Sequence, residues 1–472
     1  MDKRHRAHAF AGRLVMLGFG CIGQGVLPLL LRHIELAPGQ VRILCPDRAG
    51  QAIAEHYGVR LEVIRLTEAN YQSVLQPLLD AGDFLLNLSV GVSSLALIRW
   101  CQERAVLYLD TCSEPWAGGY TDPERSLSQR SNYALREAVL GLRRADRWGA
   151  TAVLTHGANP GLVSHFVKQA LLNLAADSGE SVAEPRDRRG WALLAQRLGI
   201  RCIHIAERDS QYGARHKLDD EFVNTWSVEG FIGEACQPAE LGWGSHEKRL
   251  PADGQRHAFG CQAAIYLQRP GAATRVRTWT PLAGPTLGYL VSHSEAISIA
   301  DYLTLGRGAH PQYRPTVHYA YRPCDDGLLS LHELAARNWR PQSRQRLLGD
   351  DLIGGIDELG VLLMGHGRRS YWYGSRLAIE QARALCPHNN ATSLQVSAAV
   401  LAGVCWAMAN PGRGLVEPDE LPHGPLLDLC RPYLGEVLGV YADWTPLVDR
   451  ERLVREDLDR DDPWQFKNFR LD

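Results

Sequence analysis

The sequence has no long hydrophobic run and no excess of charge of either sign. Its longest apolar stretch near the C-terminus, residues 396–409, is too short to span a bilayer, so we expect no membrane partner. Residues 1–13 are basic and lack the apolar segment of a signal peptide, which predicts a solvated tail. With 51 basic and 53 acidic residues, the chain has no bulk attraction for nucleic acid, and a cationic substrate would need local carboxylates.

Paired cysteines, internal repeats and low-complexity tracts are also missing. The eleven cysteines are scattered singly with no C-x-x-C spacing, which argues against a zinc site and against a disulfide framework. We therefore expect no metal and a reducing, cytoplasmic location. What remains is an ordinary soluble composition, 45% hydrophobic, in a chain of 472 residues that is long enough for two or three domains.

The most informative stretch runs from Leu14 to Gly25. An apolar run of strand length meets three glycines spaced G-x-G-x-x-G, and an apolar helical pattern follows. In a dinucleotide-binding turn Gly18 makes the tight turn, Gly20 lets the backbone approach a pyrophosphate, and Gly23 lets the helix pack on the strand. The helix N-terminus offers free N–H groups to the phosphates. The alternative is a purely structural turn. The expected cofactor-binding residues here are Gly18, Phe19, Gly20, Cys21, Ile22 and Gly23.

Strand and helix patterns alternate through the first third of the chain. Strands are expected at residues 14–17, 41–45, 61–64, 84–89, 106–111 and 152–155, and helices at residues 68–80, 94–104 and 131–145. This alternation predicts an α/β fold with a doubly wound, Rossmann-type parallel sheet. Polar residues at the carboxyl ends of strands mark the edge where ligands bind; these are Asn87, Ser89, Asp110 and Thr111.

The end of the strand at residues 41–45 bears on the choice of cofactor. An acid at this point would accept hydrogen bonds from the adenosine ribose. Cys45 stands where such an acid is expected, and Asp47 follows beside Arg48. Asp47 favours NAD, whereas an arginine near a 2′-phosphate leaves NADP open.

The pattern changes to an α+β arrangement after about residue 199. Strands are expected at residues 203–207, 222–226, 287–291, 317–321 and 361–364, and long loops such as residues 238–260 are candidates for lids or interface arms. An Ala-rich helix at residues 393–409 could dock on the first domain. We predict a cofactor domain over residues 1–150 with a return at about 390–425, a substrate and dimerisation domain over 151–389, and a helical extension over 426–472.

Several residues near strand ends are candidates for chemistry, each with a structural alternative. Glu114 follows the fifth strand and would lie near the nicotinamide, unless it is a surface acid before a proline. Glu207 ends a strand and could equally be a solvated group. Trp226 offers an indole face for a cation, with Glu234 nearby, or is a core residue. His293 and His156 could carry protons or be structural.

Several motifs together resemble those of bacterial homospermidine synthases, within the wider saccharopine-reductase-like group. They are Gly18-Phe19-Gly20-Cys21-Ile22-Gly23, Asn87-Leu88-Ser89, Asp110-Thr111 with Glu114-Pro115-Trp116, residues 131–137, Gly157-Ala158-Asn159-Pro160-Gly161, residues 224–231 and residues 391–396. The Glu-Pro-Trp segment and the segment around Trp226 discriminate best. The likeness covers nearly the whole length.

This resemblance implies NAD-dependent transfer of an aminobutyl group between two molecules of putrescine. Putrescine is oxidised to an imine, ammonia leaves, a second putrescine joins, and the new imine is reduced. By the resemblance, Trp226 would stabilise the cationic substrate, Glu207, Glu114 and Glu234 would hold ammonium groups and assist proton transfer, and Asn159 and His293 would complete the site. The cofactor site would add Asp47, Asn87, Ser89, Thr111, Ala158 and Asn159.

The resemblance also suggests a homodimer, and leaves open whether spermidine or 1,3-diaminopropane reacts. Two departures stand out: Cys45 at the ribose position, and Gly91-Val92, where an acid near the cofactor could be expected.

The enzyme alternative is a saccharopine-type or carboxynorspermidine-type reductase, whose α-carboxylate substrates need Arg or Lys clamps. The alternative from another class is a catalytically idle NAD-binding regulator or scaffold.

Overall fold

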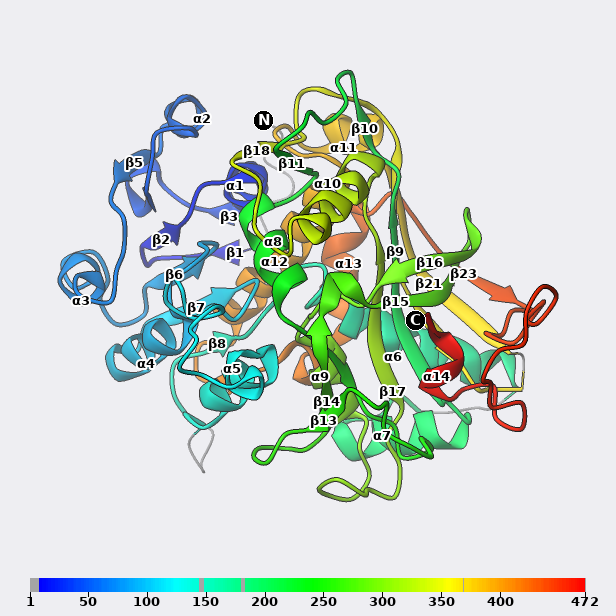
Figure 1. Ribbon diagram of the computed structural model, residues 1–472. Helices are drawn as coiled ribbons and strands as arrows, with labels where there is room; N and C mark the ends of the chain where they lie inside the picture. Colours follow the sequence, from blue (N-terminus) through cyan, green and yellow to red (C-terminus); the bar gives the residue numbers. More distant parts are fainter. Residues whose placement is uncertain (1–7, 144–147, 180–182, 368, 472) are drawn as a thin grey trace.

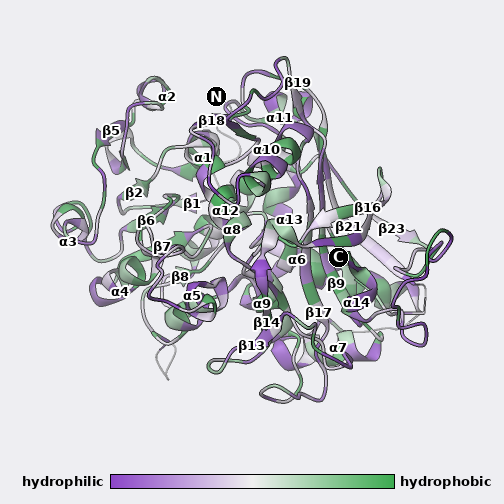
Figure 2. Ribbon diagram, in the orientation of Figure 1, coloured by the Kyte–Doolittle hydropathy of each residue, from purple (hydrophilic) through white to green (hydrophobic). Residues whose placement is uncertain are grey.

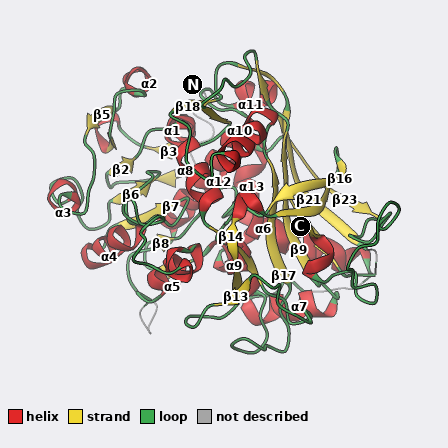
Figure 3. Cartoon of the chain, viewed as in Figure 1, coloured by secondary structure: helices red, strands yellow, loops and turns green. Residues whose placement is uncertain are grey.

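Two β-sheets with helices packed between and around them organise the molecule (Figure 1). The computed structural model describes residues 8–143, 148–179, 183–367 and 369–471. The smaller sheet is built from the N-terminal third of the chain and one strand near residue 415, and the larger one from residues after 200. Figure 3 shows both sheets flanked by helices, with long connections at the periphery.

The first sheet has seven parallel strands in the order β22-β8-β7-β6-β2-β4-β5. Their bounds are β2 Leu14–Leu17, β4 Val41–Cys45, β5 Arg60–Val63, β6 Phe84–Asn87, β7 Leu107–Asp110, β8 Ala152–Val153 and β22 Leu415–Val416. The chain runs outward from β2 in one direction, then returns and continues from β6 in the other. This is the expected Rossmann-type order, and its switch point, where ligands bind in such folds, lies between β2 and β6.

Helices cover both faces of this sheet. On β2, Leu14 and Met16 point into one core with helices α1 (Cys21–His33) and α12 (Ala391–Ala409). Val15 and Leu17 point into a second core with α3 (Tyr71–Leu75), α4 (Ser94–Arg104) and α5 (Asn132–Leu140). This alternation of side chains between two cores is what a strand covered on both faces requires. The doubly wound sheet is therefore confirmed.

Two expected helices are shorter than their patterns indicate. The helix expected over residues 68–80 is limited to α3, and Pro77, which has no N–H to continue the hydrogen bonds of the helix, follows two residues after its end. The helix expected over residues 131–145 ends at Leu140, and Gly141 follows it. Residues 144–147 lie outside the described part of the chain.

Helix α12 corrects the expectation about the apolar stretch at residues 396–409. The whole helix is 19 residues long. Its most apolar window of 18 residues has a mean hydropathy of 1.5, so by length and composition the helix could cross a membrane. Within the protein, however, 83% of this window is buried, and the helix packs against α1 and α13. It is a core helix that brings the chain back to the first sheet, where β22 pairs with β8.

The second sheet has eleven strands and is mixed. Its main path is β13-β14-β12-β17-β9-β20-β21-β23, with β15, β16 and β24 attached. The bounds are β9 Cys202–Asp209, β12 Pro238–Gly242, β13 Gly254–Arg256, β14 Ala264–Pro270, β15 Arg275–Thr280, β16 Gly284–Tyr289, β17 Thr316–Arg322, β20 Ile356–Met364, β21 Ser370–Ala378, β23 Glu436–Ala442 and β24 Arg470–Leu471. Strands β9 and β17 run parallel at its centre, in register with Glu207 beside Tyr321.

Short strand pairs and helices complete the fold. The pairs are β1 (His8–Ala9) with β3 (Ile34–Glu35), β10 (Tyr212–Gly213) with β19 (Leu352–Gly354), and β11 (Glu221–Asn224) with β18 (Arg344–Leu347). The helices are α2 Gln51–His56, α6 Leu162–Asp177, α7 Arg188–Arg197, α8 Val228–Cys236, α9 Glu295–Tyr302, α10 Asp325–Ala336, α11 Ile379–Leu385, α13 His423–Cys430 and α14 Phe466–Phe469.

Two expectations about the second half of the chain were wrong in part. The loop expected over residues 238–260 contains β12 and β13, and β12 is a fully buried strand between β14 and β17. Pairing with these neighbours outweighs the loop-like composition of the segment. The extension over residues 426–472 is not purely helical, because it contributes β23 and β24 to the second sheet.

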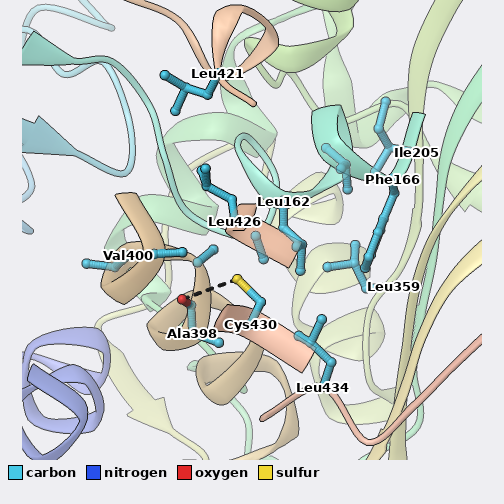
Figure 4. Packing of buried hydrophobic residues seen from close by; sticks show 14 of the residues in the cluster. Leu162, Phe166, Ile205, Leu359, Ala398, Val400, Leu421, Leu426, Cys430 and Leu434 are labelled. Atoms are coloured by element: carbon cyan, nitrogen blue, oxygen red, sulfur yellow. Dashed lines mark hydrogen bonds between the residues drawn. The ribbon is translucent and has the colours of Figure 1, made fainter. Parts of the chain in front are cut away.

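A continuous hydrophobic core joins the two sheets. Helices α6, α12 and α13 pack together between them, and Phe166 on α6 lies near Ile205 and Leu359 of the second sheet (Figure 4). In the same view the Cys430 thiol donates a hydrogen bond to the Ala398 carbonyl at 3.4 Å. Hydrophobic residues gather in these central elements, whereas many peripheral loops are hydrophilic (Figure 2). The two sheets are therefore held in a fixed relation, and a site can form where their edges meet.

Candidate active site

The glycine turn between β2 and α1 has the geometry of a phosphate-binding turn. Gly18 has a φ of +83°, and a Cβ there would lie 2.6 Å from the Leu88 carbonyl oxygen at the end of β6. A Cβ on Gly23 would lie 2.8 Å from the Gly18 carbonyl oxygen, so helix and strand approach closely. A Cβ on Gly20 would have no described atom within 4 Å. The three glycines therefore divide their roles as expected: turn, open approach and close packing.

The N-terminus of α1 is free to receive an anion. Its N-cap residue is Gly20, which has no side chain to accept a hydrogen bond from the first turn, and that turn carries no acid. The first N–H groups of the helix therefore point toward the open side of the turn. The ring of Phe19 is buried against Gly50. Phe19 can thus reach a ligand only through its backbone.

Residues at the neighbouring strand ends lie beside this turn. The Gly18 N–H donates to the Leu44 carbonyl at 2.8 Å, which brings the end of β4 next to the glycines. Asp47 is exposed there, and its carboxylate accepts a hydrogen bond from the Ala49 N–H at 2.8 Å. At the end of β6, the Asn87 Oδ1 atom accepts hydrogen bonds from the hydroxyl and N–H of Ser89. The role of these residues in cofactor binding stays a prediction.

The turn after β8 places Ala158 and Asn159 beside Thr111, which follows β7 at the same edge of the sheet. A Cβ on Gly157 would lie 3.5 Å from the Thr111 Cβ, and Ala158 is buried beside it. The side chain of Asn159 extends from this edge to the second sheet, where its Nδ2 atom donates a hydrogen bond to Glu207 Oε2 at 2.8 Å. This contact joins the first sheet to the second.

Glu207 is a buried carboxylate at the centre of the site. It lies on β9, and its Oε2 atom accepts hydrogen bonds from Asn159 and from the Tyr319 hydroxyl. Burial raises its pKa to about 7, although both hydrogen bonds and the nearby His293 favour the charged form. The carboxyl is therefore poised to exchange a proton near neutral pH.

A second acidic group forms around His293. Its Nε2 atom lies 2.8 Å from Glu234 Oε2, and its Nδ1 atom lies 3.3 Å from Glu295 Oε1. Burial opposes protonation of this imidazole, but the two carboxylates outweigh it and hold the pKa of His293 well above its usual value. The imidazolium is thus the favoured form, and it orients the carboxylate of Glu234.

Glu114 faces the same group from the first domain. Burial raises its pKa to about 7, and the charge of Glu234 adds to the shift. Its Oε2 atom accepts a hydrogen bond from the Gly91 N–H at 3.3 Å. The Gly91-Val92 turn, which departs from the expected pattern, therefore holds an acid through its backbone.

Trp226 lies in the turn between β11 and α8 and is half-buried. Its Nε1–H donates to the Tyr321 hydroxyl at 3.0 Å, and its ring centroid lies 4.9 Å from that of Phe231. The adjacent Ser227 backbone contacts the thiol of Cys21 at the start of α1. The indole is therefore close to the glycine turn, on the side of the second domain.

The structure joins five of the six predicted catalytic residues through one network of contacts, and the sixth, Glu114, is near enough to Glu234 for its charge to raise the pKa of Glu114. Tyr319 and Tyr321 on β17 connect this network, since their rings stack at 5.2 Å and reach Glu207, His293 and Trp226. Sequence reasoning missed both tyrosines and Glu295. Their alternation along an expected strand was the signal available for the tyrosines, because residues i and i+2 share a face.

His156 is placed outside this network. Its Nε2 atom lies 3.0 Å from Nε2 of His165 on α6, both rings are fully buried, and burial lowers the pKa of His156 to about 4. A neutral, buried imidazole of this kind supports the structural interpretation. Among the residues that the structure describes, no group of three or more His, Cys, Asp or Glu is arranged to hold a metal ion.

The segment at residues 131–137 fastens the two domains beside the site. The N–H groups of Asn132 and Tyr133 at the start of α5 donate to the buried Glu240 carboxylate of β12, at 2.7 and 3.2 Å. Asn132 Nδ2 donates to the Ser292 carbonyl at 2.9 Å, one residue before His293. Arg136 forms ion pairs with Glu417 and Asp301. This motif therefore fixes the position of His293 relative to the first sheet.

The fold and site define a two-domain dinucleotide-binding enzyme with a cluster of buried acids and aromatic side chains where the domains meet. Residues 14–153 match the family of the saccharopine dehydrogenase NADP binding domain, and residues 157–440 match the saccharopine dehydrogenase C-terminal domain. The chain is 53% identical to the homospermidine synthase of Blastochloris viridis over 98% of both chains. It is 50% identical to that of Mesorhizobium japonicum over 97% of this chain and 96% of the relative.

A solved structure agrees with these sequence relatives. The crystal structure of the homospermidine synthase of Legionella pneumophila in complex with NAD is 47% identical, covers 98% of both chains and has a TM-score of 0.91. The chain belongs to the homospermidine synthase family. The resemblance inferred from the motifs is thereby confirmed.

Proposed function

We propose that this chain makes homospermidine from two molecules of putrescine, with NAD as a cofactor that stays bound. The observation that carries the proposal is the network around Glu207, in which the acids Glu207, Glu234 and Glu295 surround His293 beside the indole of Trp226. Putrescine is a dication near neutral pH, so its burial needs carboxylates at both ends. Neither Arg nor Lys is among the side chains described in this network, which disfavours a reductase of α-carboxylate substrates.

The residues can be assigned to the steps of the reaction. Glu207 would accept a proton from one ammonium group, since hydride loss requires a neutral amine. Glu114 and Glu234 would hold the other ammonium group, with His293 orienting Glu234. The face of Trp226 would stabilise the iminium formed on the substrate. The amine of the second putrescine then attacks this carbon, ammonia leaves, and the new imine is reduced to homospermidine.

The glycine turn fits the NAD pyrophosphate. Residues Gly18 to Gly23 would receive the phosphates on the N–H groups of α1, and Asp47 would receive the ribose. Asn87, Ser89, Thr111, Ala158 and Asn159 would line the path toward the nicotinamide. When bound, NAD supplies the acceptor for the hydride of the first step and the donor for the last.

Replacing Gly20 with alanine tests the cofactor assignment. Gly20 has a φ of −75°, which alanine adopts freely, and its Cβ would meet no atom that the structure describes within 4 Å. The variant should fold normally but bind NAD roughly tenfold or more weakly, about 1.4 kcal/mol, because the methyl group occupies the phosphate approach. Isothermal titration calorimetry and thermal unfolding would measure both effects.

Gly18→Ala is the matched comparison. Its φ of +83° and the short approach to Leu88 predict loss of stability, by about 1–3 kcal/mol, together with binding. Unchanged NAD affinity in the folded Gly20→Ala protein would contradict the assignment.

We further propose a cytoplasmic homodimer that accepts putrescine, with spermidine or 1,3-diaminopropane as further substrates to be tested. All eleven cysteines lie in the described part of the chain and are free, which supports a reducing compartment. The dimer rests on the resemblance to the family alone, and light scattering of the purified protein would test it.

Isotopically labelled putrescine tests the proposed reaction most directly. The expected products are ammonia and homospermidine carrying label in both four-carbon units, formed with NAD present in far smaller amount than product. Mass spectrometry of the product measures this outcome. Stoichiometric consumption of NADPH with a keto acid would instead support the reductase, and retained NAD with no turnover of any diamine would support a regulator.

A further inference from the structure

Two tyrosines of β17 link the groups to which the proposed reaction assigns different tasks. Tyr319 and Tyr321 alternate along the strand, so their side chains share one face. Both are buried, and their rings stack with centroids 5.2 Å apart and planes 11° from parallel. The two hydroxyl groups therefore sit on one rigid unit within the central strands of the second sheet.

Tyr319 serves the proton-transfer side of the site. Its hydroxyl donates a hydrogen bond to Glu207 Oε2, and its ring lies 4.4 Å from the ring of His293. It thus contacts the base and the imidazolium at once. A hydroxyl that donates to a carboxylate stabilises the charged form and fixes which oxygen remains free.

Tyr321 serves the cation-binding side. Its hydroxyl oxygen accepts the Nε1–H of Trp226 at 3.0 Å, and its ring centroid lies 5.6 Å from that of Phe231. The face of an indole is useful to a cation only when it is held toward the charge. The hydrogen bond at the edge of the ring supplies that orientation while leaving the face free.

The surroundings of Glu207 determine what the loss of each hydroxyl would change. Asp209 lies on the same strand, and Asp357 of β20 lies directly opposite Asp209. His293 and Asn159 approach from other segments, at the positions described above. Two side chains donate hydrogen bonds to Glu207 in these contacts, Asn159 and Tyr319. Tyr321 instead acts on the indole.

We propose that Tyr319 and Tyr321 are positioning residues that hold the base Glu207 and the indole of Trp226 at a fixed separation, so that both act on the same carbon–nitrogen bond of the diamine. This inference rests on the proposed function. Preorganisation of this kind matters because misplacement by about an ångström can cost roughly a hundredfold in rate. The strand pairing of β17 with β9 fixes Tyr321 relative to Glu207, and the hydrogen bond from Trp226 to Tyr321 ties the turn that carries the indole to the same strand.

The two Tyr→Phe variants should have different kinetic signatures. Tyr319→Phe removes a hydrogen bond that favours ionised Glu207, so the acidic limb of kcat/KM should move upward by about one pH unit. Activity should approach that of the wild type well above this limb. Tyr321→Phe should leave the limb in place and lower kcat roughly tenfold with KM changed much less, because the indole loses its anchor.

A double-variant comparison tests whether Tyr321 acts through Trp226. In a Trp226→Phe background the indole N–H is already gone, so adding Tyr321→Phe should change kcat little. Tyr313→Phe is the matched control: Tyr313 is a buried tyrosine whose hydroxyl donates to the Ile200 carbonyl at 3.0 Å. It should change thermal stability without moving either kinetic readout.

The outcomes separate this inference from the proposed function. A wild-type protein that makes no homospermidine overturns both. Normal product formation, with Tyr319→Phe keeping the wild-type pH profile and Tyr321→Phe keeping the wild-type kcat, overturns only the positioning role. Equal effects of Tyr321→Phe in the wild-type and Trp226→Phe backgrounds would show that Tyr321 does not act through the indole.

Discussion

Replacing Glu207 with glutamine is expected to lower kcat for putrescine by roughly 10²–10⁴-fold, the usual contribution of a positioned acid or base. The amide cannot accept the proton that a bound ammonium group must lose. Glutamine can still accept the hydrogen bonds of Asn159 and Tyr319 through its carbonyl oxygen. Because Glu207 is buried, a neutral side chain of the same shape should preserve the fold. Steady-state kinetics and thermal unfolding would measure the two effects.

If Glu207 is the base, the activity of the wild-type protein should increase as the pH rises and Glu207 loses its proton. Burial raises the pKa of Glu207 to about 7, so the carboxyl is protonated and inactive as a base below that value. We expect kcat/KM to rise about tenfold per unit as pH increases toward 7 and then to level. The residual activity of Glu207→Gln should lack the part of this rise that Glu207 contributes.

Glu247→Gln is a matched control for Glu207→Gln. The side chain of Glu247 is also buried, and burial raises its pKa to about 8, but it accepts hydrogen bonds from Thr316 and from the N–H of Phe466 in the C-terminal segment. Its loss should leave the acidic limb unchanged. A Glu207→Gln protein within tenfold of the wild type would show that Glu207 is not the base, and would turn attention to Glu114, whose pKa burial also raises to about 7.

Local spacing was sufficient to predict the glycine turn. The roles of Gly18, Gly20 and Gly23 follow from a tight turn, an open approach and close packing, all within a few residues. The order of the first sheet could also be predicted, because alternating strands and helices allow few right-handed arrangements. The structure confirms the doubly wound parallel sheet and shows the expected geometry of the turn, whereas the role of the glycines in cofactor binding stays a prediction.

The assembly of the site could not be predicted from spacing, because its contacts join distant parts of the chain. The hydrogen bond from Tyr319 to Glu207 spans 112 residues, and that from Trp226 to Tyr321 spans 95. The resemblance to the family named Glu207 and Trp226, yet it said nothing of what holds them. The tyrosines and Glu295 emerge only when β9, β17 and α9 are packed together.

Local composition gave a wrong prediction where pairing with distant strands determines the secondary structure. Gly and Pro made residues 238–260 look like a loop, but β12 is held between β14 and β17. Glu240 on that strand then receives the N–H groups at the start of α5. A segment interpreted as a lid is thus part of the rigid frame that positions His293.

Replacing Trp226 with leucine is expected to lower kcat by roughly 30-fold or more, because a desolvated cation–π contact is worth about 2 kcal/mol or more. Trp226→Phe keeps an aromatic face, although a weaker one that lacks the bond to Tyr321, and should fall between leucine and the wild type. The effect should appear in kcat more than in KM, since the iminium forms after the substrate binds. Rates with putrescine, compared with thermal stability, would measure it.

Trp243→Phe separates this effect from a general loss of packing. Trp243 is buried in the core beneath the C-terminal segment, with its ring 6.2 Å from that of Phe466. Its replacement should lower stability without altering kcat. If Trp226→Phe and Trp226→Leu turned over putrescine as fast as the wild type, the indole would be no more than a core side chain. A graded loss, largest for leucine, would show that the ring face itself lowers the barrier, because both variants lose the hydrogen bond to Tyr321 and only phenylalanine keeps a π-face.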